Sequence, residues 1–182
     1  MSNLENKLKK IVNTFNNIDK NLAYEDIKKL STKYHKNINV LNVLSQIAQK
    51  MGDVDTTINS LKKILLLDKS NIECISKIYK LLLTKSLLDE ALANINLILR
   101  IDKDHYEAIR DKAYIYFLKN NFDKAKKYID NISKLQEKDF FAYNIKGLIY
   151  FKNSNFNEAK NYFQQAIKIN SKYVDKCTNY FF

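Results

Sequence analysis

Proline and tryptophan are absent from this chain of 182 residues, and it contains only two glycines. Sandwiches, barrels and hairpins rely on proline and glycine in their turns, so this shortage argues against an all-β fold. At 46% hydrophobic residues the chain can still bury a core, which argues against wholesale disorder. The composition therefore predicts an all-α protein with short polar loops. Its length suits one compact domain or a short array of repeats.

Cysteine and long apolar runs are also scarce. Cys74 and Cys177 lie far apart without metal-type spacing, which predicts reduced structural thiols in a reducing compartment. The first ten residues, MSNLENKLKK, lack the apolar core of a signal peptide. No segment approaches the roughly eighteen apolar residues that a membrane span needs. We therefore expect a cytoplasmic protein without a membrane span.

Arginine is rare even though the chain is basic. Lysine and arginine together number 31 against 20 acidic residues, a net charge of +11, yet only Arg100 and Arg110 are arginines. A positive charge attracts nucleic acid, anionic lipid or acidic protein. Nucleic-acid sites favour arginine, and a surplus of lysine, asparagine and isoleucine is typical of an AT-rich genome. Codon bias is therefore the stronger explanation of the lysines. We expect the partner to be another protein, with an acidic segment and apolar anchors as one possibility, and a basic nucleic-acid-binding helical repeat protein is the alternative.

Residues suited to catalysis or metal binding are equally few. Histidine occurs only at His35 and His105, and no nucleotide-binding, nucleophile or paired metal-ligand motif is present. Asp53 and Asp55 lie at a predicted turn and helix start, where carboxylates cap the helix and interact with its dipole. We therefore expect no catalytic residue, no metal and no cofactor, and hence no enzyme.

The chain does contain an internal repeat. The segment NSNFNEAKNYFQQAIKIN, residues 153–170, resembles KNNFDKAKKYIDNISKLQ, residues 119–136, which lies 34 residues earlier. Stepping back by the same interval gives columns that keep their residue type: Ala159, Ala125, Ala91 and Thr57; Phe156, Phe122, Leu88 and Val54; Phe163, Ile129, Ile95 and Leu61; Ile169, Leu135, Ile101 and Leu67. A fixed period of this size is typical of a stacked repeat array.

Each copy divides into two helical segments. In the last copy, Tyr143, Gly147 and Tyr150 follow helical spacing before the polar stretch KNSN at 152–155. A second set with the same spacing follows the turn: Phe156, Ala159, Phe163, Ala166 and Ile167. Small residues such as Gly147 and Ala159 let two helices approach closely. We therefore expect Ala125 and Ala159 to be buried where paired helices cross.

The segment AYNIKGLIYFKNSNFNEAKNYFQQAIKIN, residues 142–170, resembles a tetratricopeptide repeat. It has an early aromatic, a glycine followed by a tyrosine three residues later, an asparagine–aromatic turn, and alanine, phenylalanine and alanine in the second helix; the period of 34 is also that family's. The resemblance implies a right-handed superhelical array of antiparallel helix pairs, about ten helices in one domain. The copies would be 38–71, 72–105, 106–139 and 140–173, with a degenerate copy at 4–37 and a short C-terminal cap at 174–182. The family's helix-ending proline is missing, replaced by Lys69, Lys103, Glu137 and Ser171.

The same resemblance implies a non-catalytic scaffold that binds a partner peptide or helix in a concave groove lined by the first helix of each copy. The residues expected there form a polar, cationic end and an aromatic, apolar end: Asn42, Gln46, Lys77, Lys80 and Arg110, then Tyr114, Phe117, Phe141, Ile145, Leu148 and Phe151. The apolar side chains require cover. A ligand or the tail at 174–182 could supply it. The tail could instead pair with a second copy, so a structural homo-oligomer is another alternative.

Overall fold

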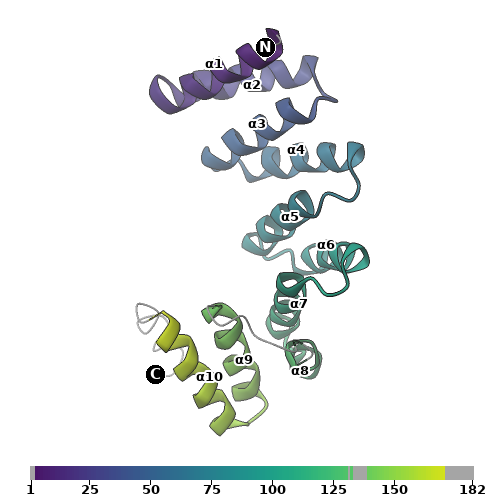
Figure 1. Ribbon diagram of the computed structural model, residues 1–182, viewed down its shortest axis with the longest axis vertical. Helices are drawn as coiled ribbons and strands as arrows, with labels where there is room; N and C mark the ends of the chain where they lie inside the picture. Colours follow the sequence, from purple (N-terminus) through teal and green to yellow (C-terminus); the bar gives the residue numbers. More distant parts are fainter. Residues whose placement is uncertain (1–2, 131, 133–138, 171–182) are drawn as a thin grey trace. The chain divides into compact units, whose positions relative to one another are not determined.

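The structure, a computed structural model, describes residues 3–130, 132 and 139–170. Within these residues the chain is all α-helical and contains no strand (Figure 1). The helices are α1 (Asn3–Asn17), α2 (Lys20–Lys33), α3 (Ile38–Lys50), α4 (Val54–Leu67), α5 (Ile72–Thr84), α6 (Leu88–Ile101), α7 (Tyr106–Leu118), α8 (Phe122–Asp130), α9 (Phe140–Lys152) and α10 (Phe156–Ile169). The predicted all-α fold is confirmed. The predicted C-terminal cap, 174–182, lies outside the described residues.

The helices recur with the period of the sequence. The first helices α3, α5, α7 and α9 begin at Ile38, Ile72, Tyr106 and Phe140, each 34 residues after the one before. The second helices α4, α6, α8 and α10 begin at Val54, Leu88, Phe122 and Phe156, with the same interval. One helix, one short turn and one further helix therefore form the structural unit that repeats.

A residue with left-handed backbone stands at the same place in each of four turns between paired helices. Gly52 has φ of 77°, and Ser86, Asn120 and Ser154 have φ of 57°, 57° and 62°. After each of them, a backbone N–H returns to a carbonyl five residues back, as from Asp53 to Ala48 at 2.9 Å. This hydrogen bond and the left-handed residue form the Schellman ending of a helix. The turn is therefore specified locally.

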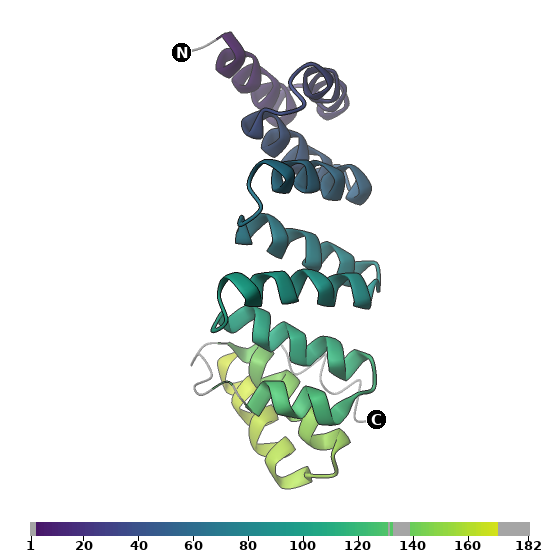
Figure 2. The same cartoon turned by 90° about the vertical axis from the view of Figure 1, so that its right-hand side faces the viewer.

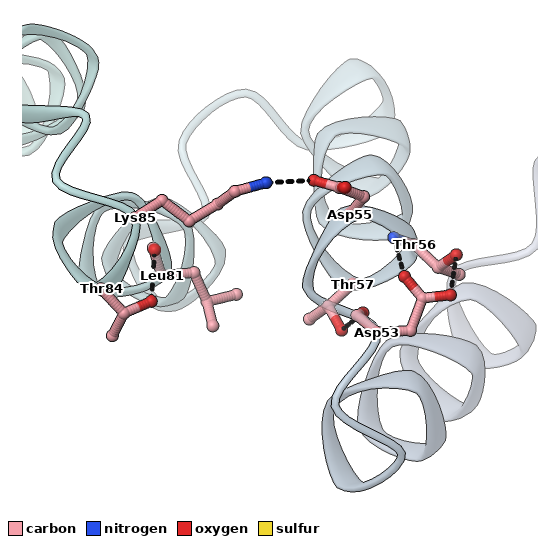
Figure 3. A network of polar contacts seen from close by, with 7 residues as sticks. All are labelled: Asp53, Asp55, Thr56, Thr57, Leu81, Thr84 and Lys85. Carbon is pink, nitrogen blue, oxygen red and sulfur yellow. Dashed lines mark hydrogen bonds and ion pairs between the residues drawn. The ribbon is translucent and has the colours of Figure 1, made fainter.

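Side chains also decide where the helices start. Each of the four first helices is capped by the residue before it, whose side chain accepts a backbone N–H three residues on: Asn37, Asn71, His105 and Asp139. Asp53 caps the second helix α4 in the same way, accepting the Thr56 N–H at 2.9 Å, and Asp55 lies in the first turn (Figure 3). The capping role predicted for Asp53 is confirmed, and Asp55 lies in the first turn, where a carboxylate interacts favourably with the helix dipole. Such caps contribute about 1 kcal/mol each.

The chain forms two compact units, Met1–Leu97 and Ile98–Phe182. In the first unit each helix from α1 to α4 packs against the next, and the antiparallel course of α3 and α4 can be followed in Figures 1 and 2. Its core includes Phe15, Ile27 and Leu44. Two polar contacts join residues that are distant in sequence. Tyr24 Oη donates to Asp53 at 2.6 Å. Lys85 pairs with Asp55 at 2.6 Å, and this contact is drawn in Figure 3.

In the second unit α7 packs on α8, α8 on α9, and α9 on α10. Ala125 and Ile145 are fully buried in its core, and Ala159 is only 2% exposed. The burial predicted for the two alanines is confirmed. Gly147 faces the ring of Phe163, so closely that a methyl group on Gly147 would lie 2.7 Å from the ring carbons. The small residues therefore hold α9 and α10 in close contact.

Candidate protein-binding surface

Three of the predicted groove residues meet in the second unit. The rings of Tyr114 on α7 and Phe141 on α9 are 5.4 Å apart in an edge-to-face arrangement. The Arg110 guanidinium lies 5.0 Å from the centre of the Phe141 ring. Tyr114 and Phe141 are half-buried, and the Arg110 side chain is largely buried. They form one cluster from two successive first helices, in which each ring has a partner that limits its rotation.

Arg110 is held by two carboxylates. Its Nε donates to Asp111 Oδ1 at 2.7 Å, and its Nη1 donates to Asp139 Oδ2 at 2.6 Å. The side chains of all three residues are largely buried, with exposed fractions of 13%, 6% and 12%. Burial by itself lowers the pKa of Arg110, but the hydrogen bonds and charges of Asp111 and Asp139 outweigh it and raise that pKa above its usual value. The guanidinium that lies over the Phe141 ring is therefore held in place by two charge-assisted hydrogen bonds.

The remaining aromatic groove residues form a pattern that repeats. The ring centres of Phe117 and Phe122 are 5.7 Å apart. The pair 34 residues later, Phe151 and Phe156, has its ring centres 5.5 Å apart. Phe117 and Phe151 are half-buried, as is Leu148, whereas Phe156 is 59% exposed. Helices α7 and α9 therefore each present a partly covered ring near the C-terminal end, next to the turn.

The prediction for Ile145 is wrong. This residue was expected to line the groove, but it is fully buried in the core of the second unit. Helix α9 is apolar on nearly all sides, so helical spacing alone does not tell which stripe faces the core. Ile145 cannot contact a ligand in this structure.

The polar residues expected at the other end of the groove lie in the first unit. Asn42 is half-buried and Gln46 is exposed, both on α3. On α5, Lys77 forms an ion pair of 2.6 Å with Glu73, one helical turn earlier. The hydrogen bond from Lys77 is the largest cause of the lowered pKa of Glu73, and the positive charge of Lys77 is the next. Lys80 is exposed, with its Nζ 5.9 Å from the Tyr79 ring.

Sequence reasoning missed the two carboxylates that hold Arg110. Asp111 is adjacent to it, and Asp139 is 29 residues away, at the start of α9. A signal for Asp139 does exist, because it occupies the same repeat position as the caps Asn37, Asn71 and His105. The repeat period predicts its role as a cap but carries no information about the arginine.

The two units, each built from antiparallel helices with a period of 34 residues, define an all-α helical repeat protein. Residues 107–139 and residues 140–173 each match the tetratricopeptide repeat family. Residues 107–173, the part of the chain that is matched, therefore consist of two repeats of this family. Comparison of its sequence with curated proteins gave no match.

Solved structures of the same fold include a crystal structure of MamA, 20% identical, with a TM-score of 0.73 over 96% of this chain and 98% of that one. A tetratricopeptide repeat protein from Parabacteroides merdae is 22% identical, with a TM-score of 0.76 over 90% of this chain and 65% of that one. A thermophilic protein of the family from Thermus thermophilus is 16% identical, with a TM-score of 0.62 over 97% and 96%. At these identities the likeness shows the fold.

Two other kinds of site are absent from the part of the chain that the structure describes. No group of three or more histidine, cysteine, aspartate or glutamate side chains there is arranged to hold a metal ion. Likewise, none of the helices described has the length and apolar character to cross a membrane.

Proposed function

We propose that this protein is a non-catalytic scaffold that binds a peptide or helix of another protein through the first helices of its second unit. The observation that carries the proposal is the set of half-buried apolar side chains on α7 and α9: Tyr114, Phe117, Phe141, Leu148 and Phe151. Apolar side chains gathered on successive helices and left partly exposed are typical of a binding surface. We place this activity in the cytoplasm, as expected for a chain with a buried thiol at Cys74.

The binding would use preorganised anchors. Tyr114 and Phe141 are already fixed by their mutual contact and by Arg110, so little side-chain entropy is lost when a partner covers them. Fully burying one such aromatic side chain contributes roughly 1.5–3 kcal/mol. Leu148 and Phe151 would add apolar contact on α9. Lysines such as Lys77 and Lys80 would attract an acidic partner and increase the rate of association.

The test is affinity capture from native lysate with the parent protein and two variants, Leu148→Ala and Phe151→Ala. Proteins that bind this surface should be retained at least about tenfold less by the variants, since one anchor contributes that much. Leu66→Ala is a matched control, because Leu66 is 76% exposed on α4 of the first unit and should not alter capture. Thermal melting of all four proteins checks that each is folded.

Two outcomes would overturn the proposal. Partners captured equally by all four proteins would show that the binding surface lies elsewhere. Capture of nucleic acid that disappears on raising salt from about 0.05 to 0.2 M would show phosphate-driven binding instead. Light scattering at several concentrations distinguishes the proposed scaffold from a homo-oligomer. In a homo-oligomer the same substitutions would change the mass of the free protein.

A further inference from the structure

A hollow of about 320 Å³ lies between α1 and α2 in the first unit, distant in sequence from the proposed anchors. One stripe of each helix lines it, and both stripes have the spacing i, i+3, i+4, i+7. The lining residues are Lys7, Lys10, Ile11 and Thr14 on α1, and Asp26, Lys29, Leu30 and Lys33 on α2. This spacing places the members of each stripe on one side of their helix.

The charge of the hollow is nearly all positive. Four of its eight lining side chains are lysines and one, Asp26, is acidic. Because α1 and α2 are consecutive antiparallel helices, the lysines of α1 lie opposite Lys29 and Lys33 near the end of α2, while Asp26 lies toward the turn. The lysines thus gather at one end of the hollow. Mutual repulsion there is relieved when an anion enters.

The lysines of the hollow differ from their neighbour on α2. Lys28 pairs with Glu25 at 2.6 Å and lies over the Tyr24 ring at 4.6 Å. No ion pair between residues that the structure describes involves Lys7, Lys10 or Lys29, all of which are exposed. A helix face that serves only solubility usually carries charges of both signs. Here one sign is concentrated.

The floor of the hollow is partly apolar. Leu30 is half-buried, and Ile11 is 8% exposed beneath the lysines. An apolar floor with a cationic rim is complementary to a segment that carries aliphatic side chains between carboxylates. Nucleic acid fits less well, because the cations are all lysines, which do not form the bidentate contacts that arginine makes with phosphates and bases.

We propose that the hollow between α1 and α2 is a second docking surface, whose occupant is an acidic amphipathic segment of a partner protein. Its carboxylates contact Lys7, Lys10, Lys29 and Lys33, and one or two of its aliphatic side chains cover Leu30. The first unit then binds by charge and the second by aromatic anchors. This surface stands independently of the function proposed above, since the two share no residue.

The experiment measures binding of a fluorescein-labelled peptide of about 16 residues, helical, with leucine at i and i+4 and glutamate at most other positions. Three proteins are compared by fluorescence anisotropy: the parent, Lys7→Glu/Lys29→Glu, and the control Lys127→Glu/Lys152→Glu. The control changes two exposed lysines of the second unit and alters the net charge by the same amount. Circular dichroism checks that all three melt alike.

We expect the parent to bind the peptide and the Lys7→Glu/Lys29→Glu variant to bind it at least about tenfold more weakly, with the control changed less than about threefold. An equal loss in both variants would overturn the proposal, because only net charge would then matter. Equal binding of a peptide with serine in place of both leucines would overturn it as well. So would tighter binding of a single-stranded oligonucleotide of matched charge, or no binding of the peptide at about 1 mM.

Discussion

The guanidinium of Arg110 on α7 and the carboxylate of Asp139 at the start of α9 are joined by a hydrogen bond of 2.6 Å. The other oxygen of Asp139 accepts the Ala142 N–H at 3.0 Å and so caps α9. One carboxylate therefore begins a helix and also ties that helix to the preceding repeat. Because this contact is largely buried, its loss leaves a charge without its partner in a poorly solvated place.

Arg110→Met should therefore lower the free energy of unfolding by about 3–5 kcal/mol, since it strands two carboxylates. Arg110→Lys should recover only part of this loss, because a single ammonium group cannot reproduce the two directed contacts. Urea denaturation followed by circular dichroism measures both. Arg100→Met is the matched control: Arg100 is exposed on α6, and its loss should change stability by no more than about 0.5 kcal/mol. Equal effects at the two arginines would contradict this interpretation.

The hydrogen bond from Tyr24 to Asp53 should make stability depend on pH. It is the largest cause of the lowered pKa of Asp53, followed by the hydrogen bonds from Thr56. A carboxyl whose pKa is lower in the folded state stabilises the fold above its unfolded pKa of about 3.9, and this contribution is lost as pH falls through the folded value. Tyr24→Phe should cost about 1.5 kcal/mol at pH 7 and much less at about pH 2.

The measurement is the urea midpoint of the parent and of Tyr24→Phe at both pH values. Tyr34→Phe is the control, because Tyr34 is half-buried next to the core of the same unit. A stability difference between Tyr24→Phe and the parent that stays constant from pH 7 to about pH 2 would show that Asp53 is not the group that titrates.

The left-handed turns predict stabilising substitutions. Ser86 and Ser154 have φ of 57° and 62°, a conformation that costs a residue with a side chain about 1–2 kcal/mol relative to glycine. Replacing serine by glycine removes this cost. Glycine also has more conformational freedom in the unfolded chain, which offsets part of the stability gained. Ser86→Gly and Ser154→Gly should each raise stability by about 0.5 kcal/mol, and Gly52→Ala should lower it by about 1 kcal/mol.

Ser70→Gly provides the comparison for the turns, because Ser70 is not among the residues with positive φ. There the substitution should be neutral or destabilising. Thermal melting monitored by circular dichroism measures all four variants. A gain at Ser70 as large as that at Ser86 would rule out backbone strain as the cause.

The small residues of the second helices should not tolerate a larger side chain. Ala125 is fully buried and Ala159 is 2% exposed, so Ala125→Leu and Ala159→Leu should overpack the contact between paired helices and cost about 1–3 kcal/mol. Ala93→Leu is the control, because Ala93 is exposed on α6 and leucine is nearly as good a helix former as alanine. If both core variants melt like the control, the assignment of these alanines to helix crossings is wrong.

The amino-acid sequence by itself determined the all-α fold and the start of each repeating helix. The signals are local: an apolar side chain every third or fourth residue, a capping side chain such as Asn37 or Asn71, and a polar turn. Each acts within a few residues along the chain, so it can be read before any tertiary contact is known. The burial of Ala125 and Ala159 follows equally, because every copy requires a small residue there.

Only the tertiary structure decided which side of an apolar helix faces the core and which charges meet. Ile145 is in the core while Leu148, on the same helix, is partly exposed. Arg110, expected as a cationic residue of the groove, is bound by a carboxylate 29 residues away. The lysines of α1 and α2 share one hollow only because the two helices pack side by side. Such contacts depend on how helices rotate against their neighbours, and the period of a single helix does not specify that rotation.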